Sequence, residues 1–312
     1  KIKVQNNLEF NQKNIVPNCV IVDANAIVHS SFHAIEPKLD KKGKDQRILY
    51  GLLSSLLDLA YKLPSIDELY LVFDPEDGYL YRKSQYSLYK ENRPPQDPLI
   101  KEQKESAIFI LEEKLGICNI KYNGFEADDT IGTLAKLKAK TSKVWVVSPD
   151  KDLLQLVEPN TILVKKIKRK GEKGYDFITY HDVKEKFGLY PHQIPDWIAL
   201  MGDSIDNLPG LDGVGNKTAI KLLNQYLSIE HLLAIAHELE NVKLKEQILH
   251  KKDTLLLVKS LATVKNDLPI SEILRVSQDK SMNIRNHENY HQNLHQMQKF
   301  FNWNEAFMDI LR

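Results

Sequence analysis

The sequence is poor in cysteine and has no long apolar segment. Its 312 residues include only Cys19 and Cys118, each inside an apolar run. This pattern excludes a disulfide framework and favours a reducing compartment. No apolar stretch approaches the ~18 residues that a membrane-spanning helix needs, and the first twenty residues contain no signal-peptide core. We therefore expect a cytoplasmic protein that does not associate with membranes.

Linker-like sequence is also missing. No Gly/Ser-rich or Pro-rich run divides the chain, and no internal repeat is visible. At roughly 100–200 residues per domain, the length predicts one large domain with an appendage, or two domains. The net charge is +1, but the acids that we assign below to one pocket leave the remaining surface basic. Such a surface suits a polyanion that is held electrostatically.

Short apolar runs lead into acidic residues at four places. Residues 19–22 end at Asp23, 69–73 end at Asp74, 118–122 lead into Glu126, and 144–147 lead to Asp150 and Asp152. Helical patterns over 49–59, 100–115 and 128–140 separate these runs, and 161–164 reads as a further strand. This alternation predicts an α/β fold with a mostly parallel sheet covered by helices on both faces.

The segment 124–130 places Glu126, Asp128 and Asp129 within four residues at the predicted start of a helix. Acids there can simply satisfy the free N–H groups and the dipole of the helix. However, the carboxyl ends of parallel strands meet at one edge of a sheet, where repulsion between so many carboxylates demands cations. Hard oxygen ligands without a Cys/His set favour Mg²⁺ or Mn²⁺.

Aromatic and basic residues are interleaved just after Asp74. They are Tyr79, Tyr81, Arg82, Lys83, Tyr86, Tyr89, Lys90 and Arg93, followed by two prolines. One interpretation is an ordinary solvated helical face. The other is a nucleic-acid clamp, in which bases stack on tyrosine rings and phosphates bind the cations. A basic run at 165–170 likewise has two interpretations, which are a phosphate contact and a solvated hairpin.

Two more acids, Asp203 and Asp206, follow a predicted helix over 194–201. Their spacing of three can place both on one face of a turn. Gly213 and Gly215 then permit a tight turn whose N–H groups can face a phosphate, and Lys217 begins the next helix. Such an element grips a duplex backbone without reading bases, although an ordinary helical hairpin has the same pattern.

These motifs, in this order, resemble the 5′ nucleases of the flap endonuclease group. The most similar member type is the N-terminal 5′–3′ exonuclease domain of bacterial DNA polymerase I, and the resemblance runs from about residue 20 to about residue 269. The matching segments are 22–23, 72–74, 89–90, 93–95, 126–129, 150–156 and 201–210. The resemblance implies a PIN-like α/β core with a helical arch and a C-terminal helix-hairpin-helix (H3TH) subdomain.

The resemblance also implies boundaries and residue roles. We expect a loose extension over 1–17, a nuclease core over 18–190 with its arch at 79–117, a duplex-binding subdomain over 191–270 and a tail over 271–312. The first metal site would use Asp23, Asp74, Glu126 and Asp128, and the second Asp150, Asp152 and Asp203, with Asp129 and Asp206 as supporting acids. In the arch around Arg82, Tyr89 would stack on a base, and Lys90 and Arg93 would contact the scissile phosphate. Gly213, Gly215 and Lys217 would hold duplex DNA, in this family often with a K⁺ ion.

The activity implied is that of a structure-specific 5′–3′ exonuclease and 5′-flap endonuclease. It would hydrolyse DNA phosphodiester bonds with two Mg²⁺ ions, or Mn²⁺ in their place, during primer or flap removal in replication and in repair. The expected partner is DNA with a 5′ flap or a 5′ end beside duplex, with RNA primer strands as a further candidate, bound by a monomer. The family usually has glycine where this chain has Pro149, which removes no ligand.

Three other functions fit parts of the pattern. A PIN-type ribonuclease shares the acidic edge but lacks the arch and the 213–217 element. A catalytically silent DNA-binding module should have lost at least one of the acids, and none is missing. A phosphatase with an Asp-x-Asp nucleophile conflicts with Asn25. The residues are equally compatible with a stand-alone nuclease and with a fragment of a polymerase.

Overall fold

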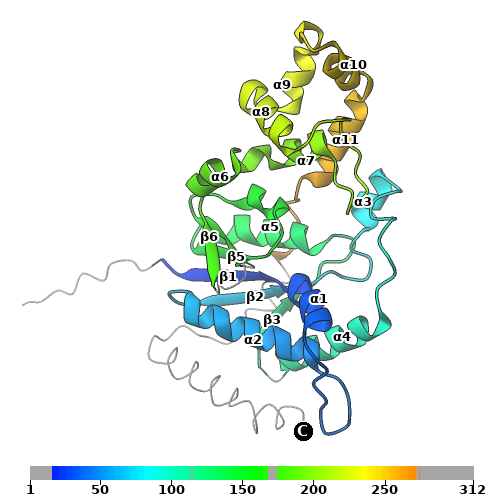
Figure 1. Ribbon diagram of the computed structural model, residues 1–312. Coiled ribbons are helices and arrows are strands. Elements are labelled where there is room, and N and C mark those ends of the chain that lie inside the picture. The colour runs from blue at the N-terminus through cyan, green and yellow to red at the C-terminus, as the bar shows by residue number, and fades with distance from the viewer. Residues whose placement is uncertain (1–15, 114, 168–173, 272–273, 275–312) are drawn as a thin grey trace, which may run out of the picture.

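The computed structural model describes residues 16–113, 115–167, 174–271 and 274. It has a sheet with helices on both faces and, beyond one of these faces, a group of helices from the second half of the chain (Figure 1). The expectations for 1–15, for 168–170 and for most of 271–312 lie outside the described residues.

One mostly parallel sheet forms the centre. Its strands are β1 Asn18–Asp23, β2 Glu68–Val72, β3 Cys118–Ile120, β4 Lys143–Val147, β5 Thr161–Lys166 and β6 Tyr175–Ile178. They lie in the order β3-β2-β1-β4-β5-β6, and every neighbouring pair is parallel except β5 and β6. The five predicted strands and the parallel α/β class are confirmed. The antiparallel edge strand β6 was not predicted.

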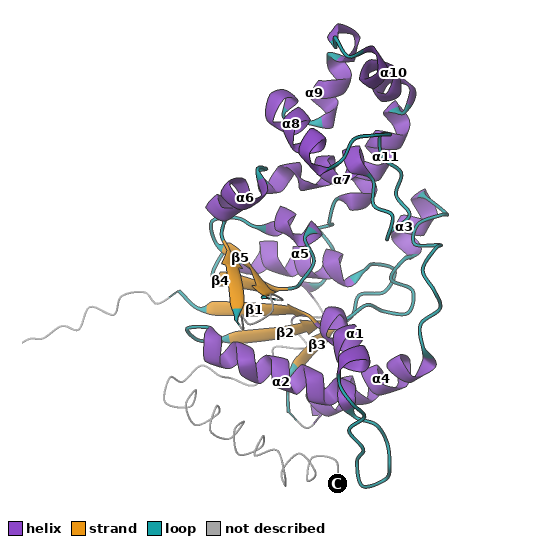
Figure 2. Ribbon diagram, viewed as in Figure 1, coloured by secondary structure: helices purple, strands orange, loops and turns teal. Residues whose placement is uncertain are grey.

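Helices cover both faces of this sheet. The helices α1 Ala24–Ala34, α2 Arg47–Lys62 and α4 Pro98–Glu113 lie on one face, and α5 Ala127–Lys138 lies on the other (Figure 2). Strand β1 shows why both faces need cover. Its Val20 and Val22 pack with α1, α2 and α4, its Cys19 and Ile21 pack on the opposite face with α5, and all four are fully buried. Alternate side chains of a strand point to opposite faces, so a strand apolar throughout must be enclosed on both sides.

Apart from β5 and β6, the described elements after β4 are helical. These helical elements are η1 Asp152–Leu156, α6 Tyr180–Phe187, η2 Pro191–Gln193, α7 Ile194–Met201, α8 Asn216–Tyr226, α9 Ile229–Ala234, η3 Ala236–Glu238, α10 Val242–His250 and α11 Lys252–Ala262. The helix predicted at 194–201 is confirmed as α7. One continuous apolar core joins these helices to α5 and its face of the sheet. Among the described residues, no helix combines the length and apolarity needed to cross a membrane.

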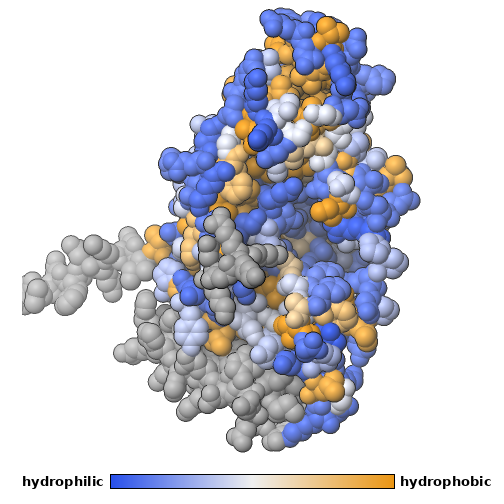
Figure 3. Space-filling view, in the orientation of Figure 1, coloured by the Kyte–Doolittle hydropathy of each residue, from blue (hydrophilic) through white to orange (hydrophobic). Residues whose placement is uncertain are grey.

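The arch region begins with a short helix, α3 Leu80–Gln85. An irregular connection over 86–97 follows, and α4 then starts at Pro98, a residue that suits the first turn of a helix. This connection runs along the edge of the molecule, from α3 beside the C-terminal helices to α4 beside the sheet (Figure 1). Hydrophilic side chains dominate the middle of the molecular face in Figure 3, where the two parts meet.

Candidate functional site

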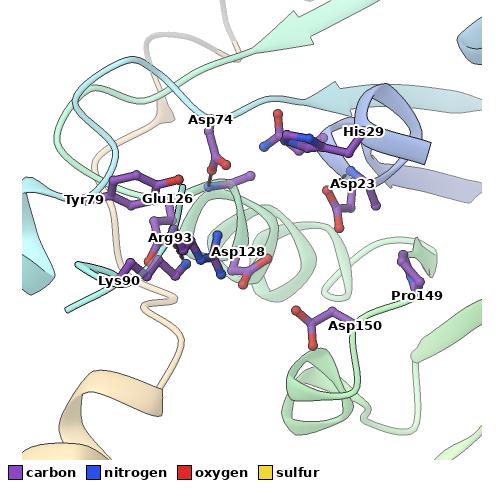
Figure 4. A pocket seen from close by; sticks show the side chains of 13 residues that line it. Asp23, His29, Asp74, Tyr79, Lys90, Arg93, Glu126, Asp128, Pro149 and Asp150 are labelled. Atoms are coloured by element: carbon purple, nitrogen blue, oxygen red, sulfur yellow. Dashed lines mark hydrogen bonds and ion pairs between the residues drawn. The ribbon is translucent and has the colours of Figure 1, made fainter. Parts of the chain in front are cut away.

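A pocket of about 280 Å³ opens at the carboxyl ends of the parallel strands. Its lining, drawn in Figure 4, is Asp23, Asn25, Ala26, His29, Asp74, Tyr79, Lys90, Arg93, Glu126, Ala127, Asp128, Pro149 and Asp150. The predicted convergence of strand-terminal acids is therefore present in the structure. Five of the acids and two of the basic residues that the sequence singled out share this pocket.

Asp23 is fixed by the elements on either side of it. One carboxylate oxygen, Oδ1, accepts a hydrogen bond from the Ala26 N–H at 3.3 Å and so caps α1. The other, Oδ2, accepts from Ser148 Oγ at 2.7 Å, and that hydroxyl accepts from the Asp150 N–H at 3.1 Å. Burial, opposed by these hydrogen bonds, raises the pKa of Asp23 to about 6, and the charges of Asp74 and Asp150 add to the rise.

Asp74 links its strand to the first turn of α5. Its Oδ1 accepts a hydrogen bond from the Ala127 N–H at 2.7 Å, which satisfies a free donor of the helix. Its backbone carbonyl accepts from Lys104 Nζ at 3.3 Å. Burial raises the pKa of Asp74.

The three acids at the start of α5 do not all face the pocket. Glu126 is buried and lines the pocket, and half-buried Asp128 lines it as well. Burial raises the pKa of Asp128 well above its usual range, and the charges of Asp150 and Asp23 raise it further. Asp129 is completely buried outside the pocket lining. Successive helical residues lie about 100° apart, so neighbouring acids cannot all face one site.

Arg82 and Asp129 form an ion pair in the interior. Arg82 is 3% exposed, and its Nη1 and Nη2 donate to the two Asp129 oxygens at 2.6 and 2.9 Å. Its Nε donates to the carbonyl of Leu261 at 2.8 Å. Its Nη1 also lies 3.1 Å from Oε2 of Glu126, a carboxylate that lines the pocket. Arg82 is therefore buried against two acids, which corrects the expectation that it belongs to a substrate clamp. Asp129, which we expected as a supporting acid, does not line the pocket and is the partner that allows Arg82 to be buried.

Tyr89 is also buried, with 3% of its surface exposed. Its hydroxyl lies 2.8 Å from Glu126 Oε2 and 3.2 Å from Asp206 Oδ2, and can donate to either. A ring enclosed in this way cannot stack on a base, which corrects our expectation for this residue. The tyrosine that lines the pocket is Tyr79 (Figure 4).

Lys90 and Arg93, which we expect to contact the scissile phosphate, both line the pocket. Lys90 Nζ forms an ion pair with Glu126 Oε1 and lies 3.5 Å from Asp206 Oδ2. Arg93 Nη2 donates to Asp206 Oδ1 at 2.5 Å. Burial opposes the charge of Lys90, but Glu126 and Asp206 outweigh it and raise the pKa of the ammonium group.

A second acidic group adjoins the pocket. The Asp152 N–H donates to Asp150 Oδ1 at 2.8 Å. Burial raises the pKa of Asp152 to about 7, and the charges of Asp150, Asp203 and Asp206 contribute. Asp152 Oδ1 is buried and has no hydrogen-bond partner. Asp203 Oδ1 accepts from the Ile205 N–H at 2.8 Å within the turn that also carries Asp206.

The chemistry of these residues fits a hard divalent cation. All the donors are carboxylate oxygens, as Mg²⁺ and Mn²⁺ prefer, and a cation would satisfy the orphaned Asp152 oxygen and offset the repulsion that raises the carboxyl pKa values. The ammonium group of Lys90 now neutralises Glu126. In the part of the chain that the structure describes, no group of three or more such side chains is already arranged to hold a metal ion.

The predicted duplex-binding residues lie outside this pocket. Gly213 has φ +77°, a conformation that favours glycine, and Gly215 precedes the first residue of α8. Both glycines and Lys217 are exposed. The turn is anchored by Trp197, whose Nε1 donates to Asn216 Oδ1 at 3.0 Å.

Sequence reasoning missed several pocket residues. His29 and Asn25 lie on α1 and line the pocket with Asp23. Their signal was available, because residues 25, 26 and 29 recur at helical spacing directly after a strand-terminal acid. Lys104 does not line the pocket but supports it, because its Nζ donates to the carbonyl of Asp74. It gave no such signal, since the residue that it contacts is distant in sequence.

Similarity to known proteins covers both parts of the chain. Residues 18–188 match the family model of the 5′-3′ exonuclease N-terminal resolvase-like domain, and 189–285 match that of the 5′-3′ exonuclease C-terminal SAM fold. DNA polymerase I of Bacillus subtilis strain 168 is 40% identical over 80% of this chain, which spans only 28% of that polymerase. The 5′-3′ exonuclease of Aquifex aeolicus strain VF5 is 39% identical over 68% of this chain and 71% of its own length.

A solved structure shows the same fold at low identity. Zinc-bound T5 5′-exonuclease has a TM-score of 0.62 and 16% identity, and the match covers 90% of this chain and 98% of that protein. The two family models together extend from residue 18 to residue 285. With the sheet, the acidic pocket and the C-terminal helices in place, the chain belongs to the 5′-3′ exonuclease family.

Proposed function

We propose that this protein is a structure-specific 5′–3′ exonuclease and 5′-flap endonuclease that hydrolyses DNA by a two-metal-ion mechanism. The observation that carries the proposal is the pocket itself, in which carboxylates from separate strands converge beside Lys90 and Arg93. Carboxylates alone would repel a phosphodiester. Two cations bound between these carboxylates, together with the two basic side chains, would make this edge of the sheet able to bind a phosphate.

The acids divide into two sets for this purpose. The first ion would be held by Asp23, Asp74, Glu126 and Asp128, and the second by Asp150, Asp152 and Asp203, with Asp206 in support. When bound, Mg²⁺ or Mn²⁺ would supply an activated water and stabilise the charge that develops on the phosphate. Cleavage would leave a 5′-phosphate and a 3′-hydroxyl.

The basic residues of the chain bind and orient the phosphate. Lys90 stays cationic because neighbouring carboxylates raise its pKa, and Arg93 is sufficiently exposed, 39% of its side chain, to reach solvent. Both can exchange their carboxylate partners for phosphate oxygens when DNA arrives. The exposed turn with Gly213, Gly215 and Lys217 would hold the duplex and a K⁺ ion.

The biological setting follows from the same proposal. A cut at the junction of flap and duplex would remove displaced 5′ strands, including RNA primers, in replication and repair in the cytoplasm, and a monomer suffices. Solved structures of the Rad2 catalytic core are in complex with DNA substrate, at a TM-score of 0.54 and 16% identity. This fold therefore accommodates DNA in that protein.

Cleavage of a 5′-labelled double-flap DNA tests the proposal. We expect cutting near the junction in Mg²⁺, none in EDTA and none with Asp128→Ala. The matched control is Asp253→Ala, which removes an exposed carboxylate from α11 outside the pocket and should cut normally. Tight flap binding without cutting in Mg²⁺ or Mn²⁺ would instead identify a DNA-binding module.

A further inference from the structure

The arch region and the C-terminal helices meet at a small contact beside the pocket. Asn207 Nδ2 donates to the carbonyl of Leu88 at 2.7 Å. In the opposite direction, Asn92 Nδ2 donates to the carbonyl of Ser204 at 2.6 Å. Each asparagine thus fixes the backbone of the other segment, and we call this reciprocal pair of hydrogen bonds, made by Asn92 and Asn207, the asparagine bridge.

Lys90 lies inside the asparagine bridge in an unusual conformation. Its φ is +55°, and that of Asn207 is +58°. Asparagine tolerates this left-handed region, whereas a long side chain such as lysine is disfavoured there. Such a conformation persists only where the surroundings hold it. The Lys90 N–H is held by a hydrogen bond to the carbonyl of Asp206 at 3.0 Å.

The conformation of Lys90 decides where its charge lies. From this backbone position its Nζ reaches Glu126 and lies 3.5 Å from Asp206. If the bridge opened, Lys90 could relax to an ordinary right-handed or extended conformation. Its side chain would then leave the carboxylates.

The bridge is poorly suited to a purely structural role. Asn92 is exposed and Asn207 is only half-buried. Hydrogen bonds open to water contribute little net stability, because water replaces a lost partner. Both bonds instead join the segment that carries Lys90 and Arg93 to the turn that carries Asp203 and Asp206.

We propose that Asn207 and Asn92 are positioning residues that hold Lys90 in its left-handed conformation, with its ammonium group at the site of the scissile phosphate. This inference rests on the proposed nuclease function. It adds that the arch acts on the phosphate only while it is joined to the turn at 203–207. Neither asparagine touches the reacting atoms, so both act through Lys90.

A double-mutant cycle tests this dependence. Asn207→Gly removes the amide without straining the left-handed backbone, and we expect a fall in kcat of ~10- to 100-fold from misplaced charge. Asn92→Ala should lower kcat in the same direction. In a Lys90→Ala background, Asn207→Gly should not lower kcat any further, because the side chain through which Asn207 acts is absent. Full additivity of the two substitutions would overturn the proposal.

The control removes a comparable bond elsewhere. Asn160 Nδ2 donates to the carbonyl of Ala139 at 3.2 Å, also at an exposed site. Asn160→Ala should leave kcat unchanged. The dissociation constant for flap DNA in EDTA should be similar for all the asparagine variants, since the duplex contacts lie on other residues.

Hydrogen exchange separates this proposal from the proposed function. In metal-free protein without DNA, peptides covering residues 86–93 should exchange faster in Asn207→Gly and in Asn92→Ala than in wild type or Asn160→Ala. Unchanged protection from exchange in both variants would overturn the proposal that the asparagine bridge holds residues 86–93. If wild type failed to cut flap DNA, the nuclease proposal would fail, while exchange would still decide whether the asparagines hold Lys90.

Discussion

Replacing Asp152 with asparagine should stabilise the metal-free protein at pH 8. The pKa of this carboxyl is raised to about 7 from its usual 3.8, first by burial and then by the charges of Asp150, Asp203 and Asp206. Its Oδ1 has no hydrogen-bond partner. An amide of nearly the same shape carries no charge, so it removes the repulsion while it fills the same space.

The sign follows from proton linkage. Between pH 4 and pH 7 the folded protein keeps a proton on Asp152 that the unfolded chain has already released. The free energy of unfolding therefore falls as the pH rises through this interval, and the full penalty applies at pH 8. At ~1.4 kcal/mol per pKa unit, a rise of about three gives an upper bound of ~4 kcal/mol. Screening in a half-buried site reduces this bound, and we expect a gain of ~1–2 kcal/mol.

Urea unfolding in EDTA at pH 8, 6 and 4.5 measures this effect. The advantage of Asp152→Asn should shrink steadily on acidification. Mg²⁺ at pH 8 should stabilise wild type more than the variant, because the cation offsets the same repulsion. Asp253→Asn, on an exposed carboxylate, serves as the control. A variant less stable than wild type at pH 8, or an advantage independent of pH, would refute the reasoning.

Three further predictions concern the frame around the site. Arg82→Met should lower the free energy of unfolding by ~3–5 kcal/mol, because it leaves Asp129 buried and unpaired. Urea unfolding should show that the double variant Arg82→Met/Asp129→Asn recovers part of this loss. No recovery would contradict the inference that Arg82 and Asp129 stabilise the fold as an ion pair. Gly132→Ala should destabilise the protein by ~1–3 kcal/mol, because the new Cβ would lie 2.5 Å from a Val264 side-chain carbon and 2.8 Å from a backbone oxygen; an unchanged melting temperature would mean that this helix does not pack on 264–265. Gly213→Ala should weaken duplex binding several-fold in EDTA, because alanine at φ +77° costs ~1 kcal/mol or more; equal affinity by fluorescence anisotropy would exclude the turn from the duplex site.

The sequence by itself determined the parallel sheet and the edge at which the acids gather. Short apolar runs end in Asp23 and Asp74, and helical patterns alternate with such runs. This alternation indicates buried parallel strands. Parallel strands bring their carboxyl ends together. The convergence of residues more than fifty positions apart therefore follows from strand order, without knowledge of any side-chain contact.

Only the tertiary structure decided which of the gathered residues face the pocket. Asp128 and Asp129 are adjacent in sequence, yet the rotation of α5 sends one into the pocket and the other to Arg82. Tyr89 and Lys90 are also adjacent, yet only Lys90 lines the pocket. The turn at 203–207, from the far half of the sequence, holds the Lys90 N–H through the carbonyl of Asp206. Side-chain direction depends on packing against distant segments, and local sequence patterns do not encode that packing.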